Sequence, residues 1–263
     1  MTENNGAPRL NESHKGHKVS LIIPIYNEAQ HLDKFLNVID ELKLEIPKEL
    51  VFIDDKSSDN SLNILKNFSF KSEYQIIAQP KNCGKGAALR VGIQQATGNF
   101  IGIQDADFEY DPNDYGKLLE PIQNGKADIV YGNRFMNPKA HRITSFVNYL
   151  ANHFLTFLSN LLSNKHFGDM EVCYKVFKRE IIQSLDLREN RFGFEPEVTL
   201  KLARGDWRFY EVPVTYNGRN VEDGKKIGWK DGVRAIYVIF RYGMTWRWAF
   251  IFLAVIIMLK LII

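Results

Sequence analysis

Short apolar runs alternate with longer amphipathic stretches along the first half of the chain. The apolar runs occupy 19–26, 50–55, 74–79, 100–107 and 127–132, and their length is typical of strands. Between them, 28–42, a stretch ending near Phe68, 87–96 and 112–123 repeat apolar residues at helical spacing. This alternation predicts an α/β fold with a mostly parallel sheet flanked by helices.

Polar residues gather where three of these predicted strands end. Open α/β sheets bind ligands at the carboxyl ends of their strands. The sequence therefore predicts a ligand site at this edge of the sheet. The residues concerned are Tyr26, Asn27 and Glu28 after the first strand, Asp54 and Asp55 at the end of the second, and the acidic run QDADFEYDP (104–112) at the end of the fourth.

The acidic run places Asp105, Asp107 and Glu109 at alternate positions. In a regular strand these side chains would face the same side, where carboxylates repel each other unless a cation or a basic group lies among them. A solvated strand end leading into an acidic turn is the plainer interpretation. The other two polar clusters on the same edge favour a cation-assisted site. Carboxylates without His or Cys suit Mg²⁺ or Mn²⁺, which commonly accompany diphosphates.

Composition and missing motifs exclude several other classes. The net charge is only +3, with no long basic run, which argues against nucleic acid as a partner. Cys83 and Cys173 lack metal-site spacing and are expected to be reduced thiols. The glycines of NCGKG (82–86) do not form a phosphate-loop motif, and no G-x-G-x-x-G follows the first strand, which disfavours a dinucleotide cofactor.

The two ends of the chain differ in character. Residues 1–18 are polar and lack the apolar core of a signal peptide, so we expect a disordered lead-in. Residues 246–263 are apolar except for Arg247 and Lys260. As a helix this segment would be ~27 Å long, close to the ~30 Å hydrocarbon core, and we predict a membrane anchor. A buried C-terminal helix is the alternative, and whether the anchor spans the bilayer stays open.

Two further helices are predicted to lie near a membrane. The stretch 143–164 has apolar residues at helical spacing and no charged residue, so it would touch lipid, or else pack on the catalytic domain predicted at 19–228. The segment 229–245 is predicted as an amphipathic interfacial helix, with a helix that covers the sheet as its alternative. Arg234, Arg241 and Arg247 precede most of the apolar run, which favours a catalytic domain on the cytoplasmic face.

Several motifs in order resemble a known family. IPIYNE (23–28), VFIDDKSSD (51–59), NCGKGAAL (82–89), QDADFEYDP and YGNRF (131–135) are similar to the successive motifs of family 2 glycosyltransferases, whose GT-A fold is Rossmann-like. DMEVCYKVFKRE (169–180), FGFEPEVTLKLA (192–203) and VPVTYNGRNVEDGKKIGWKDG (212–232) resemble the polyprenyl-phosphate sugar transferases, above all the dolichyl-phosphate mannose synthases. The resemblance covers about 19–232. It implies an inverting, metal-dependent transfer of a hexose, foremost mannose from GDP-mannose, to a polyprenyl or dolichyl phosphate at the cytoplasmic membrane face.

The resemblance also implies roles for individual residues. Asp105, Asp107 and Arg134 would be catalytic, with Asp107 and Glu109 as ligands of Mg²⁺ or Mn²⁺. The nucleotide-sugar donor would be bound by Pro24, Tyr26, Glu28, Asp55, Asp105, Arg219, Lys225 and Lys226. The acceptor phosphate would meet Arg134 together with His141, Arg142 or Ser145, whose spacing departs from the family's usual pattern.

Three alternatives stay open. A lipid phosphate arrives ionised and needs no general base, whereas a saccharide hydroxyl would need one. Glu195 and Glu197 could supply it, or could simply form a solvated helix start. The donor could be a UDP-sugar, transferred to polyprenyl phosphate or to a saccharide hydroxyl. The chain could also be a non-catalytic, sugar-nucleotide-binding membrane subunit. The sequence indicates no oligomeric state.

Overall fold

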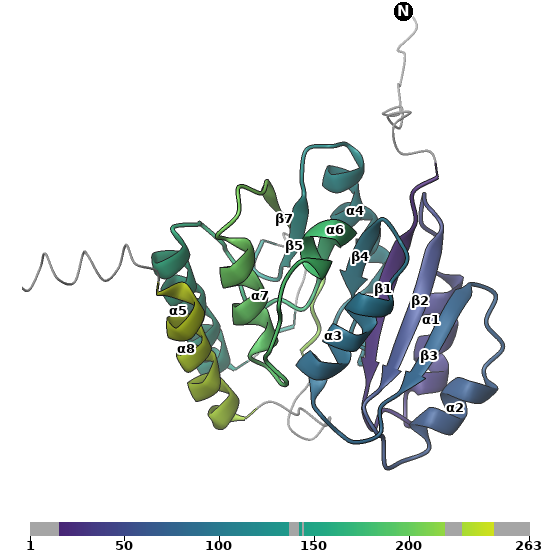
Figure 1. Cartoon of the computed structure of the whole chain (residues 1–263). Coiled ribbons are helices and arrows are strands. Elements are labelled where there is room, and N and C mark those ends of the chain that lie inside the picture. Colours follow the sequence, from purple (N-terminus) through teal and green to yellow (C-terminus); the bar gives the residue numbers. More distant parts are fainter. Residues whose placement is uncertain (1–15, 137–141, 144, 219–227, 245–263) are drawn as a thin grey trace, which may run out of the picture.

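A seven-stranded sheet forms the centre of the protein (Figure 1). The computed structural model describes residues 16–136, 142–143, 145–218 and 228–244. The sheet order is β3-β2-β1-β4-β6-β5-β7, and only β6 runs antiparallel to its neighbours. The predicted α/β fold with a mostly parallel sheet is therefore confirmed. The strands are β1 (Val19–Ile25), β2 (Lys48–Asp54), β3 (Glu73–Ala78), β4 (Phe100–Ile103), β5 (Ile129–Asn133), β6 (Lys175–Lys178) and β7 (Phe209–Pro213).

Helices flank this sheet, and those predicted in the first half of the chain are present (Figure 1). The first one starts later than predicted, because Glu28 O accepts the backbone N–H groups of His31 and Leu32 in a turn. The helices are α1 (Leu32–Glu41), α2 (Ser61–Asn67), α3 (Lys85–Gln95), the 3₁₀ turn η2 (Pro112–Asp114), α4 (Tyr115–Gln123), α5 (Phe146–Ser163), α6 (Arg179–Gln183), α7 (Phe194–Leu202) and α8 (Trp229–Gly243).

The central strands carry the core. β1 and β2 are buried along almost their whole length and are rich in Ile, Leu and Val, as expected of parallel strands covered on both faces. Lys18, before the first strand, forms an ion pair with Glu73 at 2.9 Å, and its backbone N–H donates to Asn99. The predicted disordered lead-in at 1–18 is therefore wrong for its last residues, and 1–15 lie outside the described part.

A second apolar cluster lies between α5, α7 and α8. α5 and α8 approach closely, since a Cβ at Gly243 would lie 2.7 Å from Leu162 Cβ. The buried members include Leu155, Leu162, Met170, Leu200, Ala235, Val238, Ile239 and Tyr242. The alternative that α5 packs on the domain is thus confirmed for one face, whereas the other face exposes apolar side chains and its contact with lipid stays a prediction.

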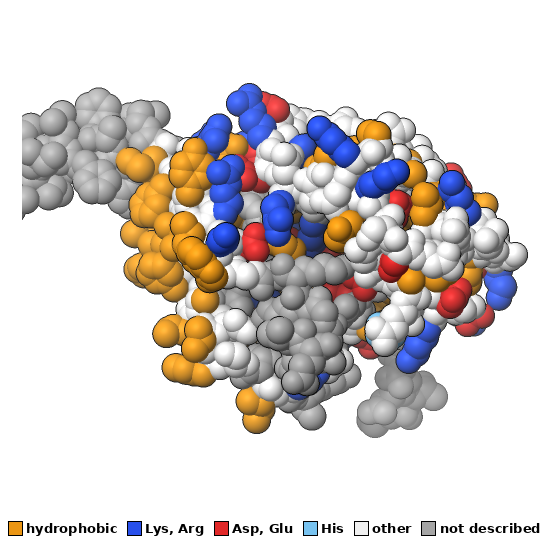
Figure 2. All heavy atoms as spheres, turned by 90° about the horizontal axis from the view of Figure 1, so that it is seen from below, with side chains coloured by type: hydrophobic (Ala, Val, Ile, Leu, Met, Phe, Trp, Pro, Cys, Tyr) orange, Lys and Arg blue, Asp and Glu red, His pale blue; other side chains and the backbone are white. Residues whose placement is uncertain are grey.

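The exposed faces of α5 and α8 form one apolar surface, at the left of Figure 2. Within the described ranges, no helix has the length and apolar character needed to cross a membrane. The predicted anchor at 246–263 lies outside those ranges. The exposed apolar residues are Ile143, Phe146, Val147, Tyr149, Leu150, Phe154, Phe157 and Leu161 from α5 and the segment before it, and Trp229, Val233, Tyr237, Phe240 and Met244 from α8 and its end.

Candidate functional site

The acidic run leaves the sheet before its first carboxylate. β4 pairs with β1 only as far as Ile103, whose carbonyl accepts the Tyr115 hydroxyl at 2.6 Å. Residues beyond it turn, and the backbone N–H of Glu109 donates to Asp107 Oδ1 at 3.1 Å. The expectation that three carboxylates alternate along a strand is therefore wrong, since a turn presents them instead. The carboxyl ends of β1, β2 and β4 do lie together, so the predicted edge is confirmed.

Lys85 neutralises the first carboxylate of this turn. Its Nζ lies 3.0 Å from each oxygen of Asp105 and 3.4 Å from Glu195 Oε1. The side chains of Lys85 and Asp105 are each only 17% exposed. Burial disfavours the charged lysine, but Asp105, Cys173 and Glu195 together outweigh this effect and raise the pKa of Lys85 well above its usual value. The acidic run requires a basic group beside its carboxylates, and for Asp105 this group is the side chain of Lys85.

The NCGKG segment brings Lys85 to this position. Gly84 has φ +93°, and a Cβ there would lie 2.5 Å from the backbone oxygen of Asn190. A Cβ at Gly86 would lie 2.4 Å from the oxygen of Glu189. The two glycines therefore permit close packing against the 189–190 backbone. Lys85 is not among the site residues predicted from the sequence. The sequence feature that points to it is its position between two glycines at the start of a helix.

Asp55 fixes the same segment from the other side. It is 3% exposed, and its carboxylate accepts from the side chain of Gln79 at 2.8 Å and from the backbone N–H groups of Cys83 and Gly84 at 2.8 and 2.6 Å. The structure thus gives Asp55 a positioning role within the chain. Contact with a nucleoside base stays a prediction.

The loop after β1 is held against the loop after β2. The backbone N–H of Glu28 donates to Ser61 Oγ at 2.9 Å, and Asn27 Oδ1 accepts from the backbone of Ser58 at 2.8 Å. Tyr26 is 37% exposed, and Pro24 lies half-buried within β1. The structure therefore brings Pro24, Tyr26 and Glu28 to the same edge as Asp55 and Asp105.

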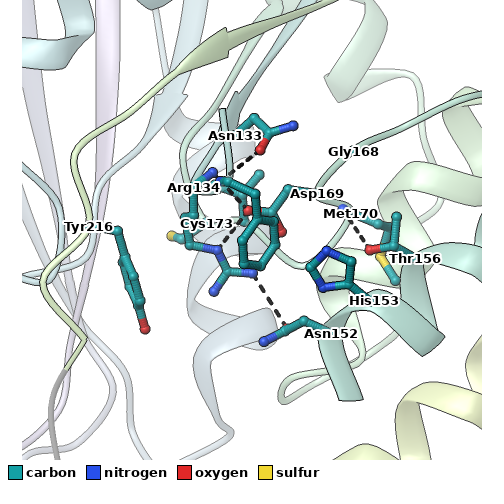
Figure 3. Close-up of polar contacts among 12 residues, drawn as sticks. Asn133, Arg134, Asn152, His153, Thr156, Gly168, Asp169, Met170, Cys173 and Tyr216 are labelled. Atoms are coloured by element: carbon teal, nitrogen blue, oxygen red, sulfur yellow. Dashed lines mark hydrogen bonds and ion pairs between the residues drawn. The ribbon is translucent and has the colours of Figure 1, made fainter. Parts of the chain in front are cut away.

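Arg134 follows β5 and is held by a buried carboxylate (Figure 3). Its Nε and Nη2 donate to the two oxygens of Asp169, each at 2.7 Å. Asp169 is fully buried and the Arg134 side chain is 10% exposed. Burial opposes the charge of Arg134, but Asp169 together with Tyr110 and Tyr216 outweighs this effect and raises the pKa of Arg134 well above its usual value. Nη2 also lies 3.4 Å from Asn152 Oδ1 on α5.

The segment that carries Asp169 is itself fixed from two directions. Glu211 on β7 accepts from the backbone N–H groups of Gly168 at 2.9 Å and Asp169 at 3.1 Å. Thr156 on α5 accepts from the backbone of Met170 at 3.2 Å. Asp169 opens the DMEVCYKVFKRE motif, yet the sequence assigned no role to it or to Glu211. These residues give Arg134 a preset orientation.

The other predicted acceptor residues are more dispersed. Arg142 is exposed, and its Nη1 donates to the backbone oxygen of Gly218 at 3.1 Å. Ser145 is exposed at the start of α5 and makes no side-chain capping bond with the helix. His141, Arg219, Lys225 and Lys226 lie outside the described residues. Arg142 thus contacts the residue directly before Arg219 in the motif 212–232.

The acidic turn offers two carboxylates to a cation. Glu109 Oε2 accepts the Tyr216 hydroxyl at 3.2 Å, and the turn places Asp107 beside it in the chain. Among the residues that the structure describes, no group of three or more His, Cys, Asp or Glu is placed to hold a metal. Mg²⁺ is commonly bound by one or two carboxylates together with substrate phosphates. Asp107 and Glu109 fit a cation that is completed by a diphosphate.

Two buried glutamates, Glu195 and Glu197, and the half-buried Glu171 belong to the same region of the domain. Glu195 and Glu197 are 5% and 0% exposed, so the interpretation of a solvated helix start is wrong. Glu197 accepts from the backbone of Arg188 and Glu189 and from Lys201, which is a structural role. Burial, followed by the charge of Glu195, raises the pKa of Glu171 to about 8.

The open sheet defines an α/β protein whose charged and polar side chains gather at the carboxyl ends of its strands. The sequence matches the Glycosyl transferase family 2 over residues 20–186. This match covers more than half of the chain, and the chain belongs to that family.

Solved structures share the fold. Glucosyl-3-phosphoglycerate synthase from Mycobacterium tuberculosis, in complex with Mn²⁺, uridine diphosphate and phosphoglyceric acid, has a TM-score of 0.66 at 18% identity, over 89% of this chain and 81% of that one. Its complex with Mn²⁺, UDP-glucose and phosphoglyceric acid gives 0.66 at 15% identity, over 92% and 85%. At these identities the likeness shows a GT-A-like fold.

Curated relatives are similar over most of this chain. They include an undecaprenyl-phosphate 4-deoxy-4-formamido-L-arabinose transferase of Yersinia enterocolitica (29% identity, 82% of this chain, 64% of that protein). A dolichol-phosphate mannosyltransferase of Pyrococcus furiosus is 27% identical over 80% and 60%. A dolichyl-phosphate beta-glucosyltransferase of Trichomonas vaginalis is 30% identical over 76% and 65%. The chain thus spans between 60% and 65% of the length of these relatives.

Proposed function

We propose that the protein is an inverting, metal-dependent glycosyltransferase. It moves a hexose from a nucleotide sugar, foremost mannose from GDP-mannose, to a polyprenyl phosphate. It works at a membrane surface with its catalytic domain on the cytoplasmic face. The names of the curated relatives, which transfer sugars to undecaprenyl or dolichyl phosphate, support this acceptor class.

One observation carries the choice of acceptor. Arg134, which is buried and cationic, is 3.4 Å from Asn152 of α5, and the outer face of this same helix exposes Phe146, Leu150 and Phe157. An arginine held in one orientation can bind phosphate through charge-assisted hydrogen bonds, and an exposed apolar helix face suits lipid. An anion site beside an apolar surface matches a molecule with a phosphate head and a hydrocarbon tail.

We assign the nucleotide-sugar donor to the edge of the sheet at which β1, β2 and β4 end. The loop of Tyr26 and Glu28 and the buried Asp55 would receive the nucleoside, while Asp105 and Lys85 lie near the sugar and diphosphate. Asp107 and Glu109 would hold Mg²⁺ or Mn²⁺, which when bound neutralises the diphosphate leaving group. Arg219, Lys225 and Lys226 remain proposed diphosphate ligands on the strength of the motif alone.

The reaction is a single displacement. A phosphate oxygen of the acceptor, oriented at Arg134, forms a bond to the anomeric carbon, and the bond from that carbon to the diphosphate oxygen breaks. The nucleoside diphosphate leaves with the bonding pair, so the anomeric configuration inverts. Because the attacking oxygen is already ionised, no side chain must remove a proton from it.

The apolar surface of α5 and α8 is the proposed membrane contact (Figure 2). Exposed apolar areas of this kind mark protein or membrane contacts. Arg241 on α8 is exposed and would meet anionic head groups, whereas Arg234 is paired with Glu189 at 2.9 Å. The apolar run 246–263 remains a proposed anchor.

The alternative reaction, transfer to a saccharide hydroxyl, would require a general base. Glu171, whose pKa is raised to about 8, is mostly protonated at neutral pH and does not favour this reaction. A UDP-sugar donor is the corresponding alternative on the donor side, and the solved neighbours were crystallised with UDP or UDP-glucose.

Turnover with matched substrates tests the proposal. The full chain in detergent, with Mg²⁺ or Mn²⁺, is given GDP-mannose or UDP-glucose, with and without undecaprenyl phosphate. The proposal expects a glycolipid product and nucleoside diphosphate release that depends on the lipid phosphate. Transfer to a saccharide in place of the lipid would favour the hydroxyl alternative. Nucleotide binding without turnover of any donor would favour the non-catalytic subunit.

A further inference from the structure

Tyr216 is fixed at the junction between the two parts of the site. It lies shortly after β7 and forms an antiparallel β-bridge with Tyr110. The backbone N–H of the next residue, Asn217, donates to Glu109 O at 2.7 Å, and the rings of Tyr110 and Tyr216 are 5.2 Å apart. The backbone of Tyr216 is thereby tied to the end of the acidic turn.

The side chain of Tyr216 contacts both proposed substrate sites. Its hydroxyl donates to Glu109 Oε2 at 3.2 Å. Its ring centroid lies 5.1 Å from Arg134 Cζ, within the range of a cation–π contact. Figure 3 shows Tyr216 on one side of Arg134, with Asn152 of α5 on the other.

We propose that Tyr216 is a positioning residue shared by the donor and acceptor sites. The hydroxyl orients Glu109 toward the cation that accompanies the donor, and the ring holds the Arg134 guanidinium for the acceptor phosphate. This inference rests on the proposed function. A hydrogen bond to a metal-binding carboxylate commonly changes metal affinity or activity by about 10–100-fold.

The two contacts can be removed separately. Tyr216→Phe deletes only the hydroxyl, and Tyr216→Leu deletes the hydroxyl and the ring. Phe135 offers a matched control, because its ring centroid also lies near Arg134 Cζ, at 5.5 Å, but its hydrocarbon ring has no hydroxyl to donate to Glu109. Phe135→Leu therefore removes an aromatic ring beside Arg134 and leaves the hydrogen bond between Tyr216 and Glu109 in place.

Binding of GDP and UDP to the full chain is measured by calorimetry with and without Mn²⁺, and the apparent KM for undecaprenyl phosphate is measured at saturating donor. For Tyr216→Phe, the factor by which Mn²⁺ increases nucleotide affinity should fall about 10-fold. The lipid KM should stay within a factor of about two of the wild-type value. For Phe135→Leu, the lipid KM should rise about two- to five-fold and the Mn²⁺ gain should stay unchanged. Tyr216→Leu should show both effects.

Two results would overturn the proposal: an unchanged Mn²⁺ gain in Tyr216→Phe, or a lipid KM that responds to Tyr216→Phe as strongly as to Tyr216→Leu. Thermal unfolding identifies a variant that fails to fold, and Tyr216→Phe with Phe135→Leu still tests both halves if Tyr216→Leu is lost. The calorimetric arm needs no turnover. If the wild-type chain glycosylates no polyprenyl phosphate, the proposed function fails, while that arm still decides the contact between Tyr216 and Glu109.

Discussion

The two charges at the centre of the site, Asp105 and Arg134, are neutralised in different ways. Asp105 meets one ammonium group, Lys85, which also lies 3.4 Å from Glu195. Arg134 is held by two parallel bonds of 2.7 Å to the fully buried Asp169. An ammonium on a flexible stem can turn to a new anion, whereas a forked pair keeps one orientation. We infer that the donor side is built to exchange charge partners and the acceptor side to hold one geometry.

The largest effect is expected from breaking the forked pair. Asp169→Asn would leave the buried Arg134 without its counter-charge, which commonly costs about 3–5 kcal/mol in the free energy of unfolding. Urea unfolding measures it. Asp186→Asn is the matched control, since the pair of Asp186 with Arg188 at 2.6 Å is exposed and should contribute little to stability. Equal losses in the two variants would contradict a special role for Asp169.

Removing one carboxylate of the acidic turn should abolish transfer and leave the fold intact. Asp107→Asn removes a charge that acts on the developing diphosphate, and such contacts contribute a factor of about 10²–10³ in rate. Turnover at saturating Mn²⁺ measures the effect, with the circular dichroism spectrum as the control for folding. Wild-type turnover would exclude Asp107 from the metal site.

The donor-side pair should give a smaller loss. Lys85→Met leaves Asp105 without its ammonium partner, and losing a partner of this kind commonly costs about 10–100-fold in activity or affinity. Lys85→Arg keeps the charge and should recover part of the loss. Calorimetric titration with GDP or UDP and Mn²⁺ follows the donor side directly. A loss confined to the lipid KM would place Lys85 on the acceptor side instead.

The smallest effect concerns pH. Burial and Glu195 raise the pKa of Glu171 to about 8 from the 4.5 of an unfolded glutamic acid. Between these values the folded state holds the extra proton, so stability should fall as pH rises through this window, by at most about 1.4 kcal/mol per pH unit. Glu171→Gln should flatten the dependence. An unchanged slope in denaturation curves at pH 5 to 8 would show that Glu171 does not titrate there.

Local pattern was enough to predict β1 to β5 and the edge where these parallel strands end, but it did not predict the parallel strand β7. It missed β6, because KVFK reads as half polar while Lys175 is fully buried. The burial is compensated by backbone contacts, since Lys175 Nζ donates to Met170 O at 3.1 Å and to Val172 O. No periodic pattern signals a buried lysine of this kind.

The ion pairs that neutralise Arg134 and Asp105 could not be predicted from the sequence either. Asp169 lies 35 residues beyond Arg134, and Lys85 lies 20 residues before Asp105. Each pair forms only when separate loops meet, and the insertion of β6 between β4 and β5 helps to bring them together. The motifs predict the residues of the candidate site. The partners that hold those side chains in position are seen only in the tertiary structure.

Replacing Arg134 by Lys tests the division into donor and acceptor sides most directly. The apparent KM for undecaprenyl phosphate is measured at saturating nucleotide sugar, and the affinity for the nucleoside diphosphate is measured by calorimetry. Because lysine cannot keep the forked pair with Asp169 that orients the cationic group, we predict a raised KM for the lipid and an almost unchanged nucleotide affinity. A variant that binds the nucleotide more weakly while its lipid KM stays at the wild-type value would contradict the account.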